Sequence, residues 1–342
     1  MKPISIKDVA AQAGVSPKTV SRVINGEQHV RTEVREAVMR IVDALGYRPN
    51  SSARSLSSSR SYLLGLLIDD PASGYAADIQ LGALRRSREA GYHLLIEPQN
   101  TADPRWLESL SSDLRTLDLN GVILTPPLCD RMDLITLLEA RRIPFVRISP
   151  TRDDVRSGSV AMNDREAARD MTSRLIALGH TDIGFIKGDP AHSATALRLE
   201  GFREAMMAAE LGVSPDRIQD GDFSFRAGLT LGERLLSFSR RPTAIFASND
   251  DMALGVVVTA LRLGIAVPER LSVAGFDDAP IARVSWPQLS TIRQPKREMA
   301  AAAVDILTDP SYNADPTRPE FHRTLAYEVV MRGSTAPLIS WT

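Results

Sequence analysis

The sequence predicts a small all-α unit at its N-terminus, followed by a larger α/β unit with parallel sheets. Residues 1–47 contain short helical segments with little β signal, whereas short apolar strands alternate with helical stretches from Tyr62 onward. Such alternation indicates parallel sheets that are covered by helices on both faces. The chain has 342 residues, which corresponds to about two domains.

The predicted strands of the larger unit are runs rich in Leu, Ile and Val. They are expected at residues 63–68, 93–96, 121–124, 145–148, 183–186, 244–247 and 272–274. The predicted helices lie at residues 77–90, 132–140, 165–178, 197–210, 227–238 and 252–263. Residues 62–342 are too many for one six-stranded sheet, so we expect two similar lobes. Their cleft should lie at the carboxyl ends of the strands, where open α/β sheets bind ligands.

The charge of the chain is distributed unevenly. Residues 1–60 contain ten Lys and Arg against five Asp and Glu, whereas the remaining residues contain 31 and 37. A basic unit on an acidic body favours contact between the basic unit and a polyanion.

Three features argue against a secreted or membrane protein. Cys129 is the single cysteine, so no disulfide can form within the chain, and a reducing cytoplasm fits. The N-terminus, MKPISIKDVA, has no apolar segment after its lysines, so we expect no signal peptide. We also expect no membrane span, because the chain lacks an uninterrupted apolar stretch of about 18 residues.

The start of the chain has the pattern of two short helices joined by a tight turn. The first helix is expected from Ile6 to about Ala13, capped by Ser5 and followed by the turn residue Gly14. The second helix is expected over residues 17–25, with Ser16 as its cap and a proline at its first position. The apolar seam between the two helices is expected to consist of Val9, Ala10, Val15, Val20 and Val23.

The outward face of this second helix carries residues suited to DNA. The N-terminal end of a recognition helix contacts base edges, and Arg22 can pair bidentately with guanine. Thr19 and Ser21 can donate hydrogen bonds to phosphate oxygens. The alternative is a plain helical hairpin in which Arg22 is a solvated surface charge, and these residues alone leave both interpretations open.

Residues 4–56, ISIKDVAAQAGVSPKTVSRVINGEQHVRTEVREAVMRIVDALGYRPNSSARSL, closely resemble the DNA-binding region of the lac repressor family. The resemblance implies a helix-turn-helix domain over residues 1–47, with a third helix from Thr32 to Leu45. It implies that Pro17, Lys18 and Arg22 face the bases, and that the first two set operator choice. The DNA-binding residues expected in this way are Ser16, Pro17, Lys18, Thr19, Ser21, Arg22, Asn25, Asn50, Arg54 and Leu56.

Residues 48–61, RPNSSARSLSSSRS, form a serine-rich segment that could be a bland linker. The resemblance implies instead a hinge helix over residues 51–57, capped by Asn50, which forms on DNA in pairs across a dimer axis. Leu56 is then the apolar wedge that opens a central base step in the minor groove. Arg54 is expected at a phosphate.

Residues 62–342 resemble the effector-binding domain of the same family, which is similar to a type I periplasmic sugar-binding protein. The motifs that carry the resemblance are RLEGF at 198–202, IFASNDDMALG at 245–255, VAGFDD at 273–278 and LSTIRQP at 289–295. The expected lobes comprise residues 62–161 plus 291–325, and residues 162–290 plus 326–342.

Several residues of these motifs are expected to bind a ligand in the cleft. Arg198, at the opening of a helix, can fork onto paired hydroxyls or a carboxylate. Asp277 can accept hydrogen bonds from two adjacent hydroxyls, and Asn249 can both donate and accept. The expected ligand-binding set is Tyr75, Ser193, Arg198, Phe223, Asn249 and Asp277. Weaker candidates are Asp69, Asp70, Ser149, Asn163 and His192, whereas Asp250 and Asp278 are expected to be structural neighbours.

Each of these assignments has a structural alternative. Arg198 could be a surface arginine, and Phe223, expected to stack on a flat ligand face, could be a core residue. Asp277 could instead cap the loop that follows its strand. A cleft with carboxylate, amide, guanidinium and aromatic groups suits a saccharide, and a purine or nucleoside is the alternative ligand.

The resemblance implies a transcription regulator, most simply a repressor, whose ligand changes its operator affinity. An α/β enzyme and a plain sugar-binding protein are the alternative classes. The sequence contains no G-x-G-x-x-G, no phosphate-binding loop motif and no H-E-x-x-H, and its five histidines are scattered. We therefore expect no catalysis, no cofactor and no metal.

The expected partners are a pseudo-palindromic double-stranded DNA operator, a small-molecule effector and a second copy of the chain. Two-fold symmetry of the operator mirrors that of a homodimer. No heptad segment follows the final strand expected at residues 327–331, so a dimer is favoured over a tetramer. The expected location is the cytoplasm, at the nucleoid. Whether the effector is an inducer or a corepressor stays open at this point.

Overall fold

The computed structural model describes residues 4–24, 30–47, 61–151 and 156–338. The chain divides into two compact units, residues 1–62 and residues 63–342, and each is described by itself. Asn25, Asn50, Arg54 and Leu56 lie outside the described residues, as does almost all of the expected hinge. The predicted limits of the hinge and of the lobes stay predictions.

The smaller unit is a bundle of three helices around a core of valines. The helices are α1 (Ile6–Ala13), α2 (Pro17–Ile24) and α3 (Thr32–Leu45). The backbone N–H of Ser5 donates to the Asp8 carboxylate at 2.7 Å, and Gly14 ends α1 in the left-handed conformation at φ 65°. The buried core consists of Val9, Ala10, Val20, Val23, Val38, Val42 and Tyr47.

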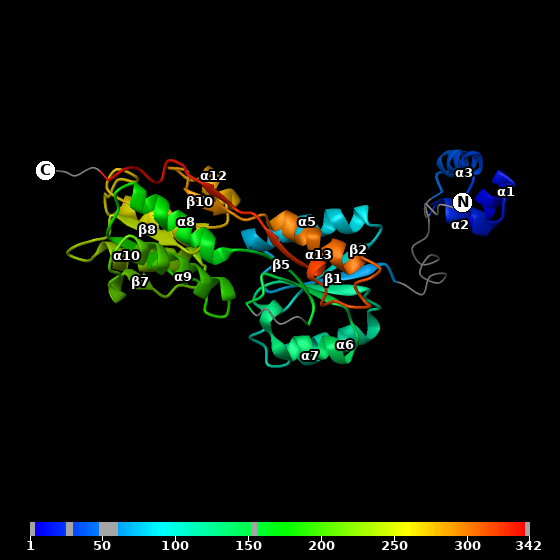
Figure 1. Cartoon of the computed structure of the whole chain (residues 1–342), viewed down its shortest axis with the longest axis horizontal. Helices are drawn as coiled ribbons and strands as arrows, with labels where there is room; N and C mark the ends of the chain where they lie inside the picture. Colours follow the sequence, from blue (N-terminus) through cyan, green and yellow to red (C-terminus); the bar gives the residue numbers. More distant parts are fainter. Residues whose placement is uncertain (1–3, 25–29, 48–60, 152–155, 339–342) are drawn as a thin grey trace. The chain divides into compact units, whose positions relative to one another are not determined.

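The larger unit contains a six-stranded parallel sheet in the order β11-β5-β4-β3-β1-β2. Its strands are β1 (Leu63–Ile68), β2 (His93–Pro98), β3 (Gly121–Leu124), β4 (Phe145–Ile148), β5 (Gly158–Met162) and β11 (His322–Leu325). Figure 1 shows two helices on each face: α5 (Gly74–Glu89) with α13 (Lys296–Thr308), and α6 (Trp106–Thr116) with α7 (Met132–Ala140). Because both faces are covered, β1, β3 and β4 are almost entirely buried.

A second parallel sheet of four strands has the order β7-β6-β8-β9. Its strands are β6 (Ile183–Ile186), β7 (Ile218–Gln219), β8 (Ala244–Ala247) and β9 (Ser272–Ala274). The helices of this part are α8 (Asp164–Ala177), α9 (Ser193–Ala208), α10 (Phe225–Leu236), α11 (Asp250–Arg262) and α12 (Pro280–Val284). Separately, β10 (Thr291–Arg293) pairs antiparallel with β12 (Glu328–Val330).

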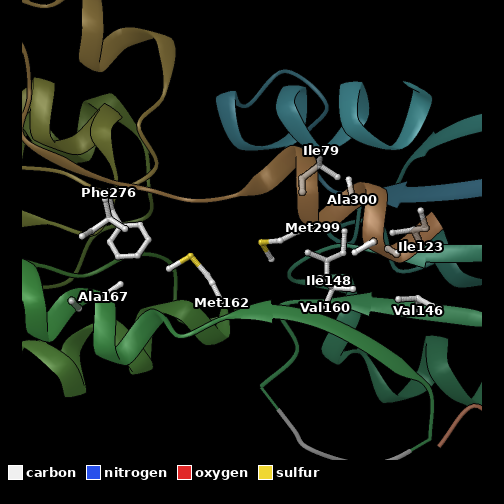
Figure 2. Packing of buried hydrophobic residues seen from close by; sticks show 14 of the residues in the cluster. Ile79, Ile123, Val146, Ile148, Val160, Met162, Ala167, Phe276, Met299 and Ala300 are labelled. Atoms are coloured by element: carbon white, nitrogen blue, oxygen red, sulfur yellow. The ribbon is translucent and has the colours of Figure 1, made fainter. Parts of the chain in front are cut away.

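One buried apolar cluster contains side chains from both sheets and their helices. Figure 2 shows Ile79 of α5 and Ala300 of α13 packed over Ile148 of the larger sheet. The same cluster includes Ala167 of α8 and Phe276, which follows the last strand of the smaller sheet. This cluster is shared by the two sheets, and two further buried clusters each cover the other face of one sheet.

The predicted strands and the three N-terminal helices are present. Six strands have the predicted bounds, and the one expected at 93–96 continues to Pro98. The helices α5, α8, α9, α10 and α11 start one to four residues before their predicted first residues, 77, 165, 197, 227 and 252. The elements α6, α12, α13, β5, β7, β10 and β11 were not predicted, and the final strand expected at 327–331 is the shorter β12.

Gly201 sets the close approach of α8 and α9. A Cβ atom at this position would lie 1.9 Å from the backbone oxygen of Arg165, which cannot move as a side chain can. Gly201→Ala gains up to about 1 kcal/mol of helix propensity, but forced overpacking typically costs about 1–3 kcal/mol. We expect the cost of the clash to exceed this gain. Gly201→Ala should therefore unfold at a lower urea concentration than the wild type, as measured by tryptophan fluorescence.

Gly212→Ala is the matched control for this substitution, because a Cβ atom there meets nothing within 4 Å. All three tryptophans of the chain lie beyond residue 62, so the fluorescence reports on the larger unit. Equal midpoints for the two variants would contradict the tight contact between α8 and α9.

Candidate functional site

The exposed face of α2 presents three of the residues expected to read DNA. Pro17, Lys18 and Arg22 are exposed, whereas Val20 and Val23 on the opposite face are buried in the core. The packing of the valines therefore fixes which side of the helix faces outward. The N-terminal end of α2 also carries the positive end of the helix dipole, which favours phosphate.

The hydroxyls at the start of α2 form a local cap. The Ser16 hydroxyl accepts a hydrogen bond from the backbone N–H of Thr19 at 3.1 Å, and the two hydroxyl oxygens lie 2.9 Å apart. Ser16 is exposed, and Thr19 and Ser21 are half-buried. The cap sets the first turn of α2 and so places Lys18 and Arg22 at the surface.

The larger unit encloses a cavity of about 340 Å³, the size of a small-ligand site. Its lining comes from segments that follow β1, β3, β4, β5, β6, β7, β8, β9 and β10. The cavity therefore lies at the carboxyl ends of the parallel strands, where the sequence predicts a cleft.

Most of the residues expected to bind a ligand line this cavity. They are Tyr75, Arg198, Phe223, Asn249 and Asp277, together with the weaker candidates Asp69, Asp70, Ser149 and His192. Ser193 and Asn163 do not line it. The Ser193 hydroxyl donates to the backbone oxygen of Ser149 at 3.2 Å, and the Asn163 side chain caps α8 by accepting from the N–H of Glu166 at 3.0 Å.

Arg198 lies in the second turn of α9, so the prediction that it opens the helix is wrong. The helix begins at Ser193, directly after its N-cap residue His192. The Arg198 side chain is buried, and its Nε and Nη2 both lie 2.8 Å from one carboxylate oxygen of Asp164. Its Nη1 donates to the backbone oxygen of Ser248 at 2.5 Å, and the guanidinium lies 3.6 Å from the ring centroid of Phe276. All three guanidinium nitrogens of Arg198 therefore already contact other groups of the protein.

Asp277 is held rigidly in the loop after β9. Its φ of 115° is unusual for a residue with a side chain, and its N–H donates to the backbone oxygen of Ile292 at 2.8 Å. One carboxylate oxygen accepts from the Gln294 amide at 2.5 Å. Burial raises the pKa of Asp277, while Lys296 and Arg198 oppose the rise. The residue is thus both fixed by the loop and part of the cavity wall.

Asn249 and Phe223 form a second fixed part of the wall. The Asn249 side chain accepts from the N–H of Met252, which caps α11, and donates to the backbone oxygen of Phe223 at 2.8 Å. Phe223 has φ 69°, and its ring meets the ring of His192 edge-on at 5.2 Å. A Cβ atom at Gly188 would lie 2.0 Å from the Phe223 ring, so the glycine makes room for it.

Aspartates dominate the polar lining of the cavity. They are Asp69, Asp70, Asp164, Asp189, Asp222, Asp251 and Asp277. Four of them, and Gln294, were not predicted as site residues: Asp164, Asp189, Asp222 and Asp251. The signal that could have found them is their position, because each lies a few residues after the end of a strand.

Asp250 and Asp278, expected as structural neighbours, do not line the cavity. Asp250 accepts hydrogen bonds from the Thr291 hydroxyl at 2.6 Å and from the N–H of Ala279 at 2.8 Å. Asp278 accepts from the guanidinium groups of Arg283, Arg293 and Arg332 at 2.9, 2.7 and 2.5 Å.

The described part of the chain has neither a metal-binding cluster nor a membrane-spanning helix. No group of three or more His, Cys, Asp or Glu side chains there is placed to hold a metal ion. None of the helices in the same ranges combines the length and apolar character needed to cross a membrane.

A helix-turn-helix unit and a two-sheet α/β unit with a polar cavity together define a DNA-binding regulator with a ligand-binding domain. Residues 5–50 match the family model of bacterial regulatory proteins of the lacI family, and residues 172–335 match that of a periplasmic binding protein-like domain. The ribose operon repressor of Haemophilus influenzae is 33% identical over 95% of this chain and 96% of its own. The transcriptional repressor PurR of Actinobacillus pleuropneumoniae is 33% identical over 98% and 99%.

Solved structures show the same relationship. The lac repressor dimer bound to operator and the anti-inducer ONPF has a TM-score of 0.78 at 27% identity, over 98% of this chain and all of that one. The complex of the regulator CelR with cellobiose has a TM-score of 0.74 at 28% identity, over 97% and 99%. The chain belongs to the lacI family of bacterial regulatory proteins, which confirms the predicted family and fold.

Removal of Arg198 should strongly destabilise the larger unit. Arg198→Ala leaves Asp164 buried without its counter-ion, and breaking a buried pair in this way costs about 3–5 kcal/mol. We expect the free energy of unfolding in urea, followed by tryptophan fluorescence, to fall by about that amount.

Arg203→Ala removes an exposed arginine from the same helix and should change the stability by less than about 0.5 kcal/mol. Adding Asp164→Asn to Arg198→Ala should restore part of the loss, because the uncompensated charge is removed. If Arg198→Ala is as stable as Arg203→Ala, the ion pair does not support the cavity wall.

Proposed function

We propose that this protein represses transcription as a homodimer on a pseudo-palindromic operator, and that a small polar effector in the cavity changes its operator affinity. The observation that carries the proposal is the presence of both sites in one chain. The face of α2 with Lys18 and Arg22 is exposed, and the cavity of the larger unit lies at the strand ends. Among relatives, the lac repressor is a dimer on its operator.

A saccharide is the ligand class that we favour. Sugar hydroxyls donate hydrogen bonds to carboxylates, and seven aspartates line the cavity. The Phe223 ring offers an aromatic face for the apolar side of a sugar. One relative is a ribose operon repressor, and CelR is solved with cellobiose.

A purine or nucleoside is the second candidate. The observations in its favour are the flat rings of Phe223 and Tyr75 in the lining, the Asn249 and Gln294 amides, and the likeness to PurR. Amides can pair with both donors and acceptors of a base.

The regulation we propose is a coupling free energy between the effector and the operator. In this proposal the effector contacts loops from both sheets, and residues 48–61, just before the larger unit, act as the hinge. The contacts we assign to Asn50, Arg54 and Leu56 in the minor groove belong to this proposal. We infer no catalytic activity for the chain, and we place it in the cytoplasm, where its operator lies.

Arg22→Ala should weaken specific operator binding without changing the fold. One bidentate contact to guanine is worth about 1–3 kcal/mol, which is roughly a tenfold to hundredfold loss of affinity. The operator is first selected from random duplexes by the wild-type protein, and affinities are then measured by gel shift at one fixed salt concentration.

Arg40→Ala is the control, because Arg40 is an exposed arginine of α3 in the same unit. Arg40→Ala removes a charge of the same sign from α3 instead of α2. Its effect on DNA affinity should be small and should not depend on the DNA sequence. Unchanged affinity of Arg22→Ala for the selected site would contradict the DNA-reading role of α2.

Asp277→Asn should weaken the effector response while preserving operator binding in its absence. The amide keeps the shape of the carboxylate but replaces an acceptor by a donor, and a hydrogen bond to a charged group contributes about 1.5–3 kcal/mol. A tenfold to hundredfold loss of effector affinity is the approximate expectation.

The measurement is a calorimetric titration with an effector found by a thermal-shift screen of sugars and nucleobases. Asp216→Asn, at an exposed position outside the cavity lining, is the control. A lower melting temperature of Asp277→Asn with normal effector affinity would show that Asp277 only holds the loop.

A further inference from the structure

We propose that the effector of this protein carries a positive charge, as a protonated amine on a small polar body such as an amino sugar. This inference rests on the proposed function, because it names the chemistry of the molecule that the same cavity binds. It follows from the balance of charge around the cavity, and from two aromatic side chains in its lining.

The carboxylates of the cavity far outnumber its cations. Of the seven aspartates in the lining, only Asp164 has an ion-pair partner within the described parts of the chain. The lining contains one guanidinium, that of Arg198, and it is this group that Asp164 neutralises. Burial lowers the pKa of His192, so its ring is a poor cation.

Lys296, which contacts Asp277, already has partners within the protein. Lys296 is buried, with its ammonium 3.2 Å from the Asp78 carboxylate and 3.0 Å from the backbone oxygen of Asp277. Asp78 in addition accepts from the Arg297 guanidinium at 2.8 Å. Lys296 thus completes an ion-pair cluster behind the wall, and it reaches a backbone oxygen of Asp277 rather than its carboxylate.

Three of the remaining carboxylates lie where their charge is disfavoured, whereas hydrogen bonds from Ser224 lower the pKa of Asp222. Burial raises the pKa of Asp69, His192 opposes the rise, and the like charges of Asp70 and Asp189 add to it. Burial also raises the pKa of Asp251 and of Asp277, and the charge of Lys296 offsets only part of each rise. A neutral ligand would displace water from these groups and leave the charges uncompensated, which is costly. A cation would compensate them in the same low-dielectric site.

Two aromatic residues of the lining add an independent reason. The Tyr75 hydroxyl oxygen is buried and has no hydrogen-bond partner among the described residues, although the side chain lines the cavity. It can accept a hydrogen bond from an ammonium group. Phe223 lies in the same lining, and an aromatic face attracts a cation within about 6 Å. Hydrogen-bond acceptors and aromatic rings both attract an alkylammonium ion, and both are present in this lining.

The experiment compares charged and uncharged molecules of matched shape. The full chain is melted in amine-free phosphate buffer with glucosamine and glucose, galactosamine and galactose, and 1,4-diaminobutane and 1,4-butanediol, at equal ionic strength. We expect at least one amine to raise the melting temperature clearly more than its uncharged partner, and to bind at least about tenfold more tightly in a calorimetric titration.

Asp251→Asn tests the charge of the wall directly. It removes one carboxylate that has no ion-pair partner among the described residues, and the affinity for the amine should fall about tenfold. Asp216→Asn removes an exposed carboxylate outside the lining and should leave that affinity unchanged. The affinity for the uncharged partner molecule should fall clearly less than the affinity for the amine.

The outcomes separate this inference from the proposed function. The inference of a positively charged effector is wrong if a neutral sugar binds as tightly as its amine. It is also wrong if no amine of the set binds more tightly than its uncharged partner. If that neutral sugar also changes operator affinity, the regulator with a saccharide effector stands. An amine that binds tightly without any effect on operator affinity supports the charge and overturns the assignment of the cavity as the effector site.

Discussion

The buried contact between Arg198 and Asp164 is the interaction on which the cavity of the larger unit depends. Asp164 is the first residue of α8, and Arg198 lies in α9. The same guanidinium donates to the backbone after β8 through Ser248 and covers the ring of Phe276 after β9. One side chain therefore ties together four segments that are distant in sequence. Because a buried pair gains little over an apolar replacement, its value lies in fixing these segments relative to one another.

Close helix contacts supply the rigid frame around this ion pair. Each of three helix pairs contains a glycine at which a Cβ atom would strike the backbone of its neighbour: Gly201 against Arg165, Gly82 against Arg297, and Gly228 against Met252. Such contacts bring two helices nearer than larger side chains allow, and they transmit strain because packed interiors deform little. Asn163 and Asn249 cap the starts of α8 and α11, so this frame also sets the loops in front of these helices.

The strands could be predicted from the sequence because burial on both faces leaves a continuous apolar signal, as in Leu63–Ile68 and Ala244–Ala247. The starts of α5 and α10 were missed because they are set by the caps Ser73 and Ser224, and apolar periodicity does not detect a cap. The two-residue β7 is too short to give any pattern.

The candidate site divides in a similar way. Phe223, Asn249 and Asp277 belong to motifs and were predicted, whereas Asp164 was not, because its importance comes from a partner 34 positions away. Its neighbours in the lining, Asp189 and Asp251, were missed because a single aspartate after a strand is common in loops. Only the fold shows that several such loops meet around one cavity.

The two proposed sites of the chain then have opposite electrostatic characters. Residues 1–60 carry an excess of Lys and Arg, which suits phosphate, whereas the cavity of the larger unit is lined by aspartates. Carboxylates that lack a counter-ion repel anions, so phosphorylated sugars and nucleotides are disfavoured in the cavity even where their shape fits. Specificity is a difference of affinities, and repulsion of the wrong ligand contributes as much to it as attraction of the right one. The aspartates of the wall therefore act against the same phosphate groups that the N-terminal unit is suited to bind.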